Sequence, residues 1–385
     1  MLKSVGGVVL AVAILLIMVT IHEFGHYLAG KALGFRINEF AVGFGPAILK
    51  KRSKKTGEIF ALRVIPLGGY CAFDGEDEYE TEATPKDAES DAETENEPTV
   101  YESNEQDYPT PTGKKFTEQP PWKRIIVLIA GATMNYLLAV LLIILAFACV
   151  GRPVYRVQVE PLKEVESGEE IVLSQDFQTG DIILALDGKP VYLITDYIDA
   201  FNGKKQGETV QARVIRGGKE QSISVRLTAN ADCKNSTDTY TLLEAMGVYG
   251  LYSVQYEHGF FATIGHSFVY SFKIGGTVLR SLGELVTGKL GINAMGGPIT
   301  TIKVTSEAAS SGILSFLNIA SFIGVNLAVF NLLPIPALDG CKVIFCLIEW
   351  IRKKPVNRKV ETIIHLAGIL FLFGFAILVD ILQFL

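Results

Sequence analysis

The stretch SVGGVVLAVAILLIMVTIHEFGH, residues 4–26, decides the fold. Its first 18 residues carry no charge, and about 20 apolar residues suffice for a helix to cross a bilayer. The stretch then runs directly into His22-Glu23-Phe24-Gly25-His26. It is long for a secretory signal peptide and lacks a small-residue cleavage site, so we interpret it as a membrane-spanning helix that ends in polar residues.

Three later runs of the chain have the same apolar character. Residues 125–150, 313–338 and 363–379 contain no charged residue apart from one histidine, and each is long enough to cross a bilayer. The mean hydropathy of +0.32 excludes an ordinary cytosolic enzyme, and the 49% of hydrophobic residues excludes a disordered chain. The sequence therefore predicts a polytopic α-helical membrane protein with about four transmembrane helices.

Lysine and arginine are concentrated in two of the links between these runs. Leaving aside an acidic tract, twelve lie between the first and second runs and six between the third and fourth, whereas the N-terminus has only Lys3. Because basic loops stay on the cytoplasmic side, both links are predicted to be cytoplasmic. Both termini and the long middle region would then be extracytoplasmic, in a multi-pass protein of the inner (plasma) membrane.

The acidic tract, Asp74–Pro111, differs from the rest of the chain. It holds 15 acidic residues and one lysine, which leaves the remainder with a charge of +8 although the whole chain carries −6. Such a composition cannot bury enough apolar surface to fold, so we predict a disordered cytoplasmic insertion, either a solvated spacer or a binding segment. The overall charge excludes a typical nucleic-acid-binding protein, whereas the basic remainder allows contact with membrane lipid.

Residues His22–His26 form an H-E-x-x-H pattern at the end of the first predicted span. Residues four apart share one helix face, so both imidazoles can reach one metal ion, and Glu23 can take a proton from a metal-bound water. Polar side chains this deep in an apolar span cost several kcal/mol unless they are paired or coordinated. The alternative is a mutually hydrogen-bonded polar trio at the membrane edge.

A catalytic zinc site takes a third protein ligand and keeps one position open. Asp339 fits this role, because it lies near the end of the segment NLLPIPALDG, residues 331–340, beside the same cytoplasmic face. The prolines Pro334 and Pro336 break the helix, and irregular backbone at that depth is tolerated only when it is buried or lines a wet cavity. The ligand types favour zinc. A helix cap is the alternative role for Asp339.

The other histidines are weaker ligand candidates. His258 and His266 fall in the region predicted to be extracytoplasmic, and His365 opens the fourth run. We interpret each of them as a surface or packing residue. Asp380 is expected at the outer boundary of the fourth run, and the five cysteines show no CxxC pair or disulfide pattern.

Residues 40–45 and 59–73 carry β-forming residues with glycine breaks. They predict strands folded back toward the membrane beside the metal helix. A helical substrate must be unwound before it is cut, and strand addition at a sheet edge would hold it extended. A cytosolic hairpin with no substrate role is the alternative.

The region between the second and third runs begins with a β-rich module, residues 154–228. Predicted strands lie at 171–173, 182–186, 210–215 and 222–227, with a short helix at 197–202. Residues 258–290 then predict an amphipathic helix with Lys273, Arg280 and Glu284 on one face. That pattern suits a helix on a membrane surface, and packing in an ordinary core is the alternative.

Together these motifs resemble the site-2 protease family of intramembrane zinc metalloproteases, in the bacterial branch similar to the regulator-of-sigma-E protease with a PDZ domain. The resemblance covers nearly all the chain except residues 74–111. The segments that carry it are His22–His26, Gly43-Phe44-Gly45-Pro46, Asn331–Gly340 and the module containing Thr179-Gly180-Asp181-Ile182-Ile183.

The resemblance implies that His22, His26 and Asp339 bind zinc and that Glu23 is the catalytic base. The substrate-positioning residues that it implies are Asn331, Pro334, Pro336, Gly43 and Gly45. It also implies cleavage in or near the transmembrane segments of single-span proteins that another protease has already shortened, such as anti-sigma factors or remnant signal peptides. The PDZ-like module would bind peptide ends or act as a steric filter, since residues 164–177 lack the usual small-residue and Gly-Leu run.

We therefore predict six parts. They are a first helix with its β-region (1–73), an acidic insertion (74–118), a second helix (119–153), a PDZ-like domain (154–230), a linker with an amphipathic region (231–312), and the third and fourth helices (313–385). Two non-enzymatic alternatives are a membrane scaffold with a structural metal and a metal-handling protein. The first would need a fourth protein ligand, and the second more His, Cys or Met than the five of each present.

Overall fold

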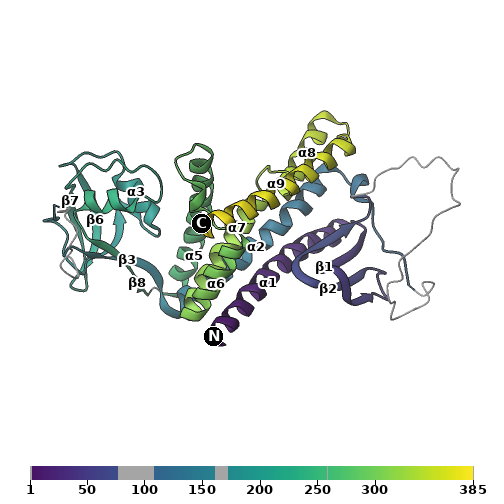
Figure 1. Cartoon of the computed structure of the whole chain (residues 1–385), viewed down its shortest axis with the longest axis horizontal. Coiled ribbons are helices and arrows are strands. Elements are labelled where there is room, and N and C mark those ends of the chain that lie inside the picture. The colour runs from purple at the N-terminus through teal and green to yellow at the C-terminus, as the bar shows by residue number, and fades with distance from the viewer. Residues whose placement is uncertain (1, 77–107, 161–171, 258, 385) are drawn as a thin grey trace. The chain divides into compact units, whose positions relative to one another are not determined.

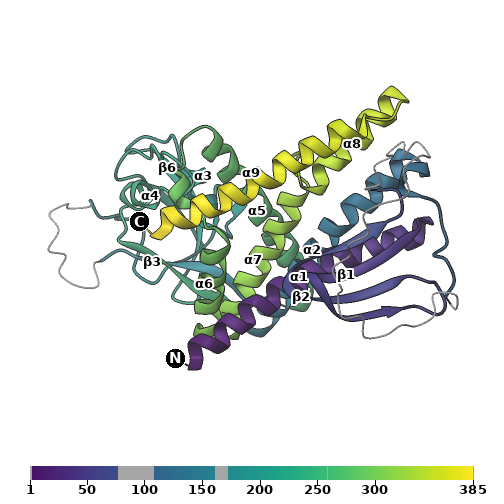
Figure 2. The same cartoon turned by 45° about the vertical axis from the view of Figure 1, so that its right-hand side comes forward.

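The computed structural model describes residues 2–76, 108–160, 172–257 and 259–384, and Figures 1 and 2 show its helices and strands. Four of the helices are long and apolar enough to cross a membrane. They are α1 (Leu2–Leu33), α2 (Pro121–Val150), α7 (Ile313–Asn331) and α9 (Arg358–Phe384). The prediction of about four such helices is confirmed. The chain divides into two compact units, residues 1–138 with 330–378 and residues 139–329 with 379–385.

The first unit contains a small sheet beside α1, made of β1 (Ile37–Arg52) and β2 (Ile59–Phe73) (Figure 1). The first half of β1, residues 37–42, pairs along one side with the end of β2, residues 69–73. Along its other side it pairs with the beginning of β2, Ile59–Leu62. Its second half pairs with Ile59–Arg63, so two long strands build four paired segments. Gly43 and Gly45 have φ angles of 89° and 83°, which glycine adopts without strain, and they let β1 bend between its halves. Both predicted strands are therefore present: the second has the predicted bounds, and the first is longer than the predicted 40–45.

The segment after α7 leaves the helix earlier than its apolar run suggested. α7 ends at Asn331, whereas the apolar run continues to Leu338. Pro334 and Pro336 have no backbone N–H to continue a helix, and tight turns replace it, with Leu338 N donating to Ile335 O at 3.1 Å. The next helix, α8, spans Asp339–Arg352.

Both ends of the predicted acidic insertion are packed, and its centre, residues 77–107, lies outside the described residues. Asp74 accepts a hydrogen bond from Arg36 at 2.7 Å. At the other end the short helix η2 (Phe116–Glu118) buries Phe116 against Phe35 and Phe73. The predicted disordered insertion, 74–118, therefore includes residues at both ends that are packed on the first unit. At its C-terminal end this is because Phe116 supplies apolar surface that the acidic tract lacks.

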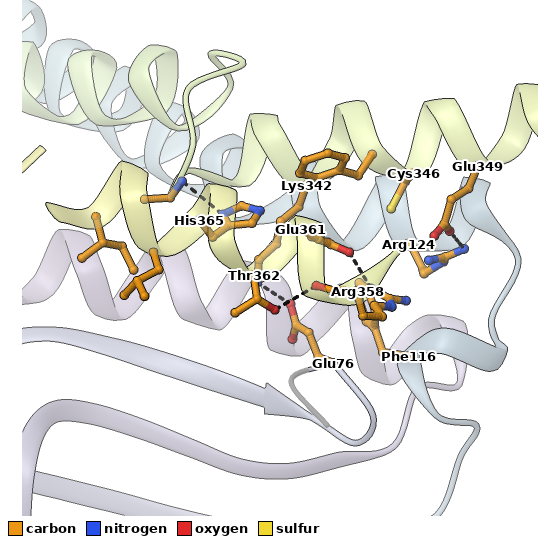
Figure 3. Close-up of a pocket in the computed structure, with 14 residues that line it drawn as sticks. Glu76, Phe116, Arg124, Lys342, Cys346, Glu349, Arg358, Glu361, Thr362 and His365 are labelled. Carbon is orange, nitrogen blue, oxygen red and sulfur yellow. Dashed lines mark hydrogen bonds and ion pairs between the residues drawn. The ribbon is translucent and has the colours of Figure 1, made fainter. Parts of the chain in front are cut away.

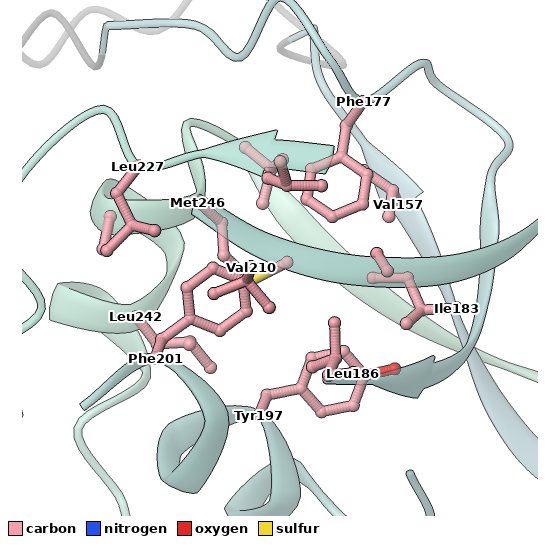
Figure 4. Close-up of a cluster of buried hydrophobic side chains, with 14 of the residues drawn as sticks. Val157, Phe177, Ile183, Leu186, Tyr197, Phe201, Val210, Leu227, Leu242 and Met246 are labelled. Carbon is pink, nitrogen blue, oxygen red and sulfur yellow. The ribbon is translucent and has the colours of Figure 1, made fainter. Parts of the chain in front are cut away.

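The second unit contains a six-stranded sheet in the order β7-β6-β4-β3-β8, with β5 paired to β4. The strands are β3 (Arg152–Gln158), β4 (Ile182–Leu186), β5 (Lys189–Pro190), β6 (Thr209–Arg216), β7 (Lys219–Arg226) and β8 (Gly250–Tyr256). Two helices, α3 (Ile194–Phe201) and α4 (Thr239–Met246), help to close an apolar core that includes Tyr197, Phe201 and Leu242 (Figure 4). Three of the predicted strands are confirmed. The remaining predicted strand, 171–173, is not seen: residue 171 lies outside the described residues, and residues 172–173 are not in a strand. The backbone N–H of the adjacent Ser174 donates to the Gly247 carbonyl.

The charged face of the predicted amphipathic helix has a protein partner. In α5 (Phe260–Val286), Lys273 pairs with Asp196, and Arg280 pairs with Asp199. Phe261 and Phe272 on the same helix are exposed. The polar face therefore contacts the β-rich domain, and placement of the helix on a membrane surface stays a prediction.

The second unit also holds the short helix η3 (Ile292–Ala294) and α6 (Pro298–Ser311), whose N-terminus is capped by the end of α9. Asp380 accepts hydrogen bonds from the backbone N–H groups of Ile299 and Thr300 at 3.1 and 3.2 Å. A carboxylate at this position satisfies orphan N–H groups and complements the helix dipole. Asp380 thus stabilises the start of α6.

Candidate metal centre

Three side chains converge in the first unit, two from α1 and one from the start of α8. His22 Nε2 lies 3.1 Å from His26 Nε2, and Asp339 Oδ2 lies 3.0 and 3.3 Å from those two atoms. Ligand bonds of 2.0–2.2 Å in a tetrahedral site place neighbouring donor atoms about 3.3–3.5 Å apart. The three atoms thus have nearly the spacing of one face of such a site, and they form a group that could hold a metal ion.

The His26 ring is held in the tautomer that metal binding requires. Its Nδ1 lies 2.8 Å from the carbonyl oxygen of Val127 in α2. A carbonyl only accepts, so Nδ1 carries the proton and Nε2 keeps its lone pair. Asp339 Oδ2 is also buried without a hydrogen-bond donor directed at it among the described residues. A buried carboxylate oxygen and an imidazole lone pair that face one point fit a cation.

Two asparagines face the other nitrogen of His22. The side-chain amides of Asn135 and Asn331 both lie 3.5 Å from His22 Nδ1. Within the described part of the chain, Asn135 Oδ1 is buried and has no hydrogen-bond partner. Turning this amide, so that its oxygen accepts from Nδ1–H, would satisfy that oxygen and leave His22 Nε2 for a metal.

Two glycines allow α1 and α2 to meet closely at the histidines. A methyl group on Gly131 would collide with His26 Nε2 and lie 2.9 Å from His22 Cε1. A methyl group on Gly25 would collide with the Ala130 carbonyl. The sequence did not predict a role for Gly131 or Asn135. A small residue and a polar residue within an apolar span are, however, typical of a close contact between two membrane helices.

Glu23 lies on the neighbouring face of α1, half-buried. A methyl group on Gly69 of β2 would lie 3.3 Å from Glu23 Cγ, so the carboxylate side chain rests against the sheet. It interacts electrostatically with His22, His26 and Asp339. Glu23 is therefore close to the three ligand atoms without joining their triangle.

Asp339 is placed by the packing of α8. Arg124 of α2 donates to Glu349 of α8 at 2.5 Å, and both side chains are buried. A cavity of about 390 Å³ lies beside this ion pair and is lined in part by Ala337, Lys342 and His365 (Figure 3). The helix that begins at Asp339 is thus anchored to α2 at its far end.

The predicted substrate-positioning residues fall in two places. Asn331 lies at His22, as described, and Pro334 and Pro336 form the turn that leads to Asp339. Gly43 and Gly45 lie at the bend of β1, where Arg63 donates to the Gly45 carbonyl at 2.7 Å. The first set adjoins the ligand group, and the second belongs to the sheet.

Comparison with known proteins gives a consistent identification. The profile of peptidase family M50 matches residues 10–375. The chain is 27% identical to the regulator of sigma-W protease RasP of Bacillus subtilis, with 92% of each protein covered. It is 25% identical to the zinc metalloprotease RasP of Geobacillus kaustophilus, with 96% of this chain and 95% of the relative covered. The chain therefore belongs to peptidase family M50 and is a zinc metalloprotease.

Proposed function

We propose that the chain hydrolyses peptide bonds in or near the transmembrane segments of single-span membrane proteins, at zinc held by His22, His26 and Asp339. One observation carries the proposal: three candidate ligand atoms lie 3.0–3.3 Å apart within a unit that contains long apolar helices. Only three protein ligands come together among the described residues. Structural zinc sites usually close with four protein ligands, whereas catalytic sites keep one position open.

In this mechanism Glu23 moves the proton. Zinc, when bound, supplies a Lewis acid that polarises the scissile carbonyl and lowers the pKa of water toward ~7. Glu23 takes the proton of the attacking water and returns it to the leaving amine. The Val127 carbonyl and the amides of Asn135 and Asn331 orient the two imidazoles.

The substrate is held as an extended strand against the end of β2. Residues 69–73 pair with the first half of β1 along one edge, and a methyl group on Gly69 would lie 3.3 Å from Glu23 Cγ. A strand added along this segment would have its backbone carbonyls free of helical hydrogen bonds and close to the base. The backbone around the proposed substrate strand is shaped by the turn with Pro334 and Pro336 and by the bend of β1 with Gly43 and Gly45. Asn331 lies beside the proposed zinc ligand His22.

The topology follows the basic residues of the first unit. Arg352, Lys353 and Lys354 at the end of α8 are exposed, and basic links favour the cytoplasmic side, where they meet anionic membrane lipid. We infer that the metal centre lies near the cytoplasmic face of the inner membrane and that both termini and the β-rich domain lie outside. We infer that this domain is PDZ-like and that it either binds a substrate end or excludes folded ones.

The substrate class follows from the relatives and the outer domain. One relative's name describes a regulator of sigma-W. We infer that the substrates are single-span proteins already cut outside the membrane, such as anti-sigma factors or remnant signal peptides, since an outer domain would obstruct larger ones.

The test compares wild type with Glu23→Gln and a matched control, Glu118→Gln, purified in detergent. Glu118 is an exposed residue whose carboxylate accepts a hydrogen bond from the Lys115 backbone N–H at 3.2 Å. Glu23→Gln is expected to retain zinc and to lower cleavage of a model single-span substrate by about 10²–10⁴-fold. Glu118→Gln should match wild type in both measurements. Full activity of Glu23→Gln, or a wild type without zinc, contradicts the proposal.

A further inference from the structure

The geometry points to His365 as a positioning residue for Asp339, acting with Gly368 through the turn that precedes α8. The inference rests on the proposed role of Asp339 as a zinc ligand. Both residues lie on α9, within the first unit. Neither carried a role in the sequence analysis, which interpreted His365 as a surface or packing residue.

The turn needs an outside contact because its backbone is strained. Ala337, two residues before Asp339, has a φ angle of +81°. Residues with a β-carbon rarely adopt positive φ, and such a conformation persists only where the surroundings hold it. A relaxed Ala337 would rotate the following peptides and turn the Asp339 carboxylate away from the histidines.

His365 supplies one such contact. The Ala337 backbone N–H donates to His365 Nδ1 at 3.1 Å (Figure 3). This bond requires a neutral ring with the proton on Nε2. The ring also lies 5.9 Å from that of Phe345 in α8, which restricts its orientation. The hydrogen bond therefore joins α9 to the backbone of the strained residue itself.

Gly368 supplies the second contact, three residues along the same helix. A methyl group on Gly368 would lie 2.6 Å from the backbone carbon and oxygen of Pro336 and would collide with its Cβ. Residues three apart share a helix face, so His365 and Gly368 hold Pro336 and Ala337 together. Pro336 and Ala337 can lie this close to α9 only while position 368 has no side chain.

The experiment measures zinc affinity of the purified full chain in detergent, by competition with a chelator, for three substitutions of His365. Asn places an acceptor oxygen where Nδ1 lies, Gln places its amide one bond further out, and Leu has no acceptor. We expect His365→Leu and His365→Gln to lower zinc affinity about 10–100-fold, and His365→Asn to stay within about threefold of wild type. Rescue by Asn but not by Gln separates a hydrogen bond to Ala337 from simple filling of space.

A second pair of variants tests the close contact of α9. Gly368→Ala is expected to lower zinc affinity at least about tenfold, because the turn must move away. Gly374→Ala is the matched control on the same helix, where an added methyl group meets no atom within 4 Å. Thermal unfolding of each variant checks that the chain remains folded.

The outcomes separate this inference from the proposed function. Asp339→Asn must lose zinc affinity, and if it does not, the proposed ligand set is wrong. If Asp339→Asn behaves as expected while His365→Leu, His365→Gln and Gly368→Ala bind zinc like wild type, the positioning role is wrong. Equal losses in Asn, Gln and Leu would overturn the hydrogen bond to Ala337.

Discussion

The β-rich domain and the helices around the candidate metal centre differ in how many polar side chains lie at the centre of their packing. In the domain, the buried cluster consists of apolar residues such as Phe201 and Leu242 (Figure 4). Around the metal centre, His22, His26 and Asn135 are buried, whereas apolar residues of α9 such as Phe373 are exposed. Apolar surface gains nothing by leaving lipid, so the contact of α1 with α2 at the histidines depends on polar groups and close packing, whereas the domain core depends on the hydrophobic effect.

The largest expected effect on zinc binding and cleavage comes from the close packing of α1 against α2. Gly131→Ala places a methyl group against His26 Nε2, so zinc affinity should fall about 100-fold or more and cleavage should be lost. The control is Gly276→Ala in α5, where an added methyl group meets no atom within 4 Å. Zinc competition and cleavage assays on both variants measure this. Normal zinc binding by Gly131→Ala would show that packing does not define the metal centre.

An intermediate effect is expected in the β-rich domain. Phe201 is fully buried, and Phe201→Ala should destabilise the domain by about 3–5 kcal/mol through the lost apolar contacts and the cavity. Zinc content should not change, because Phe201 belongs to the second unit. Hydrogen exchange of the domain and zinc analysis on the same sample test this. Loss of zinc would mean that the two regions do not fold separately.

The smallest expected effect concerns the polar contact between α5 and the domain. Burial raises the pKa of Glu284, but hydrogen bonds from Ser236 and Arg280 outweigh it and leave the pKa below its ordinary value of 4.5. A carboxylate with a lowered pKa stabilises the fold above pH 4.5, and this contribution is lost as the pH falls through the lower, folded-state pKa.

Ser236→Ala removes one of those donors, the hydroxyl that lies 2.7 Å from Glu284 Oε2. It should reduce hydrogen-exchange protection of α5 by about 1–2 kcal/mol at pH 7. At a pH below the folded-state pKa of Glu284 the difference from wild type should shrink, because the carboxylate becomes protonated. An equal difference at both pH values would argue against the charged hydrogen bond.

The parts that the sequence predicted are those with a local signature. Apolar runs mark helices, the spacing of His22 and His26 marks one helix face, and the prolines before Asp339 mark a helix break. Gly131 and His365 have no such signature, because their roles depend on where α1 packs on α2 and where α9 meets the turn before α8. The charged face of α5 looked suited to a membrane surface because its partner, the domain around Asp196 and Asp199, is distant in sequence.

The crossing of α1 and α2 also limits how a substrate can reach the zinc. Gly25 lies against the Ala130 backbone and the Met134 side chain, where even one added methyl group would collide. Under the proposed function, a transmembrane substrate would therefore find no entrance at this contact between the two helices. If the proposed function holds, we expect a peptide to arrive from the other side of α1, where Glu23 lies near Gly69 of β2.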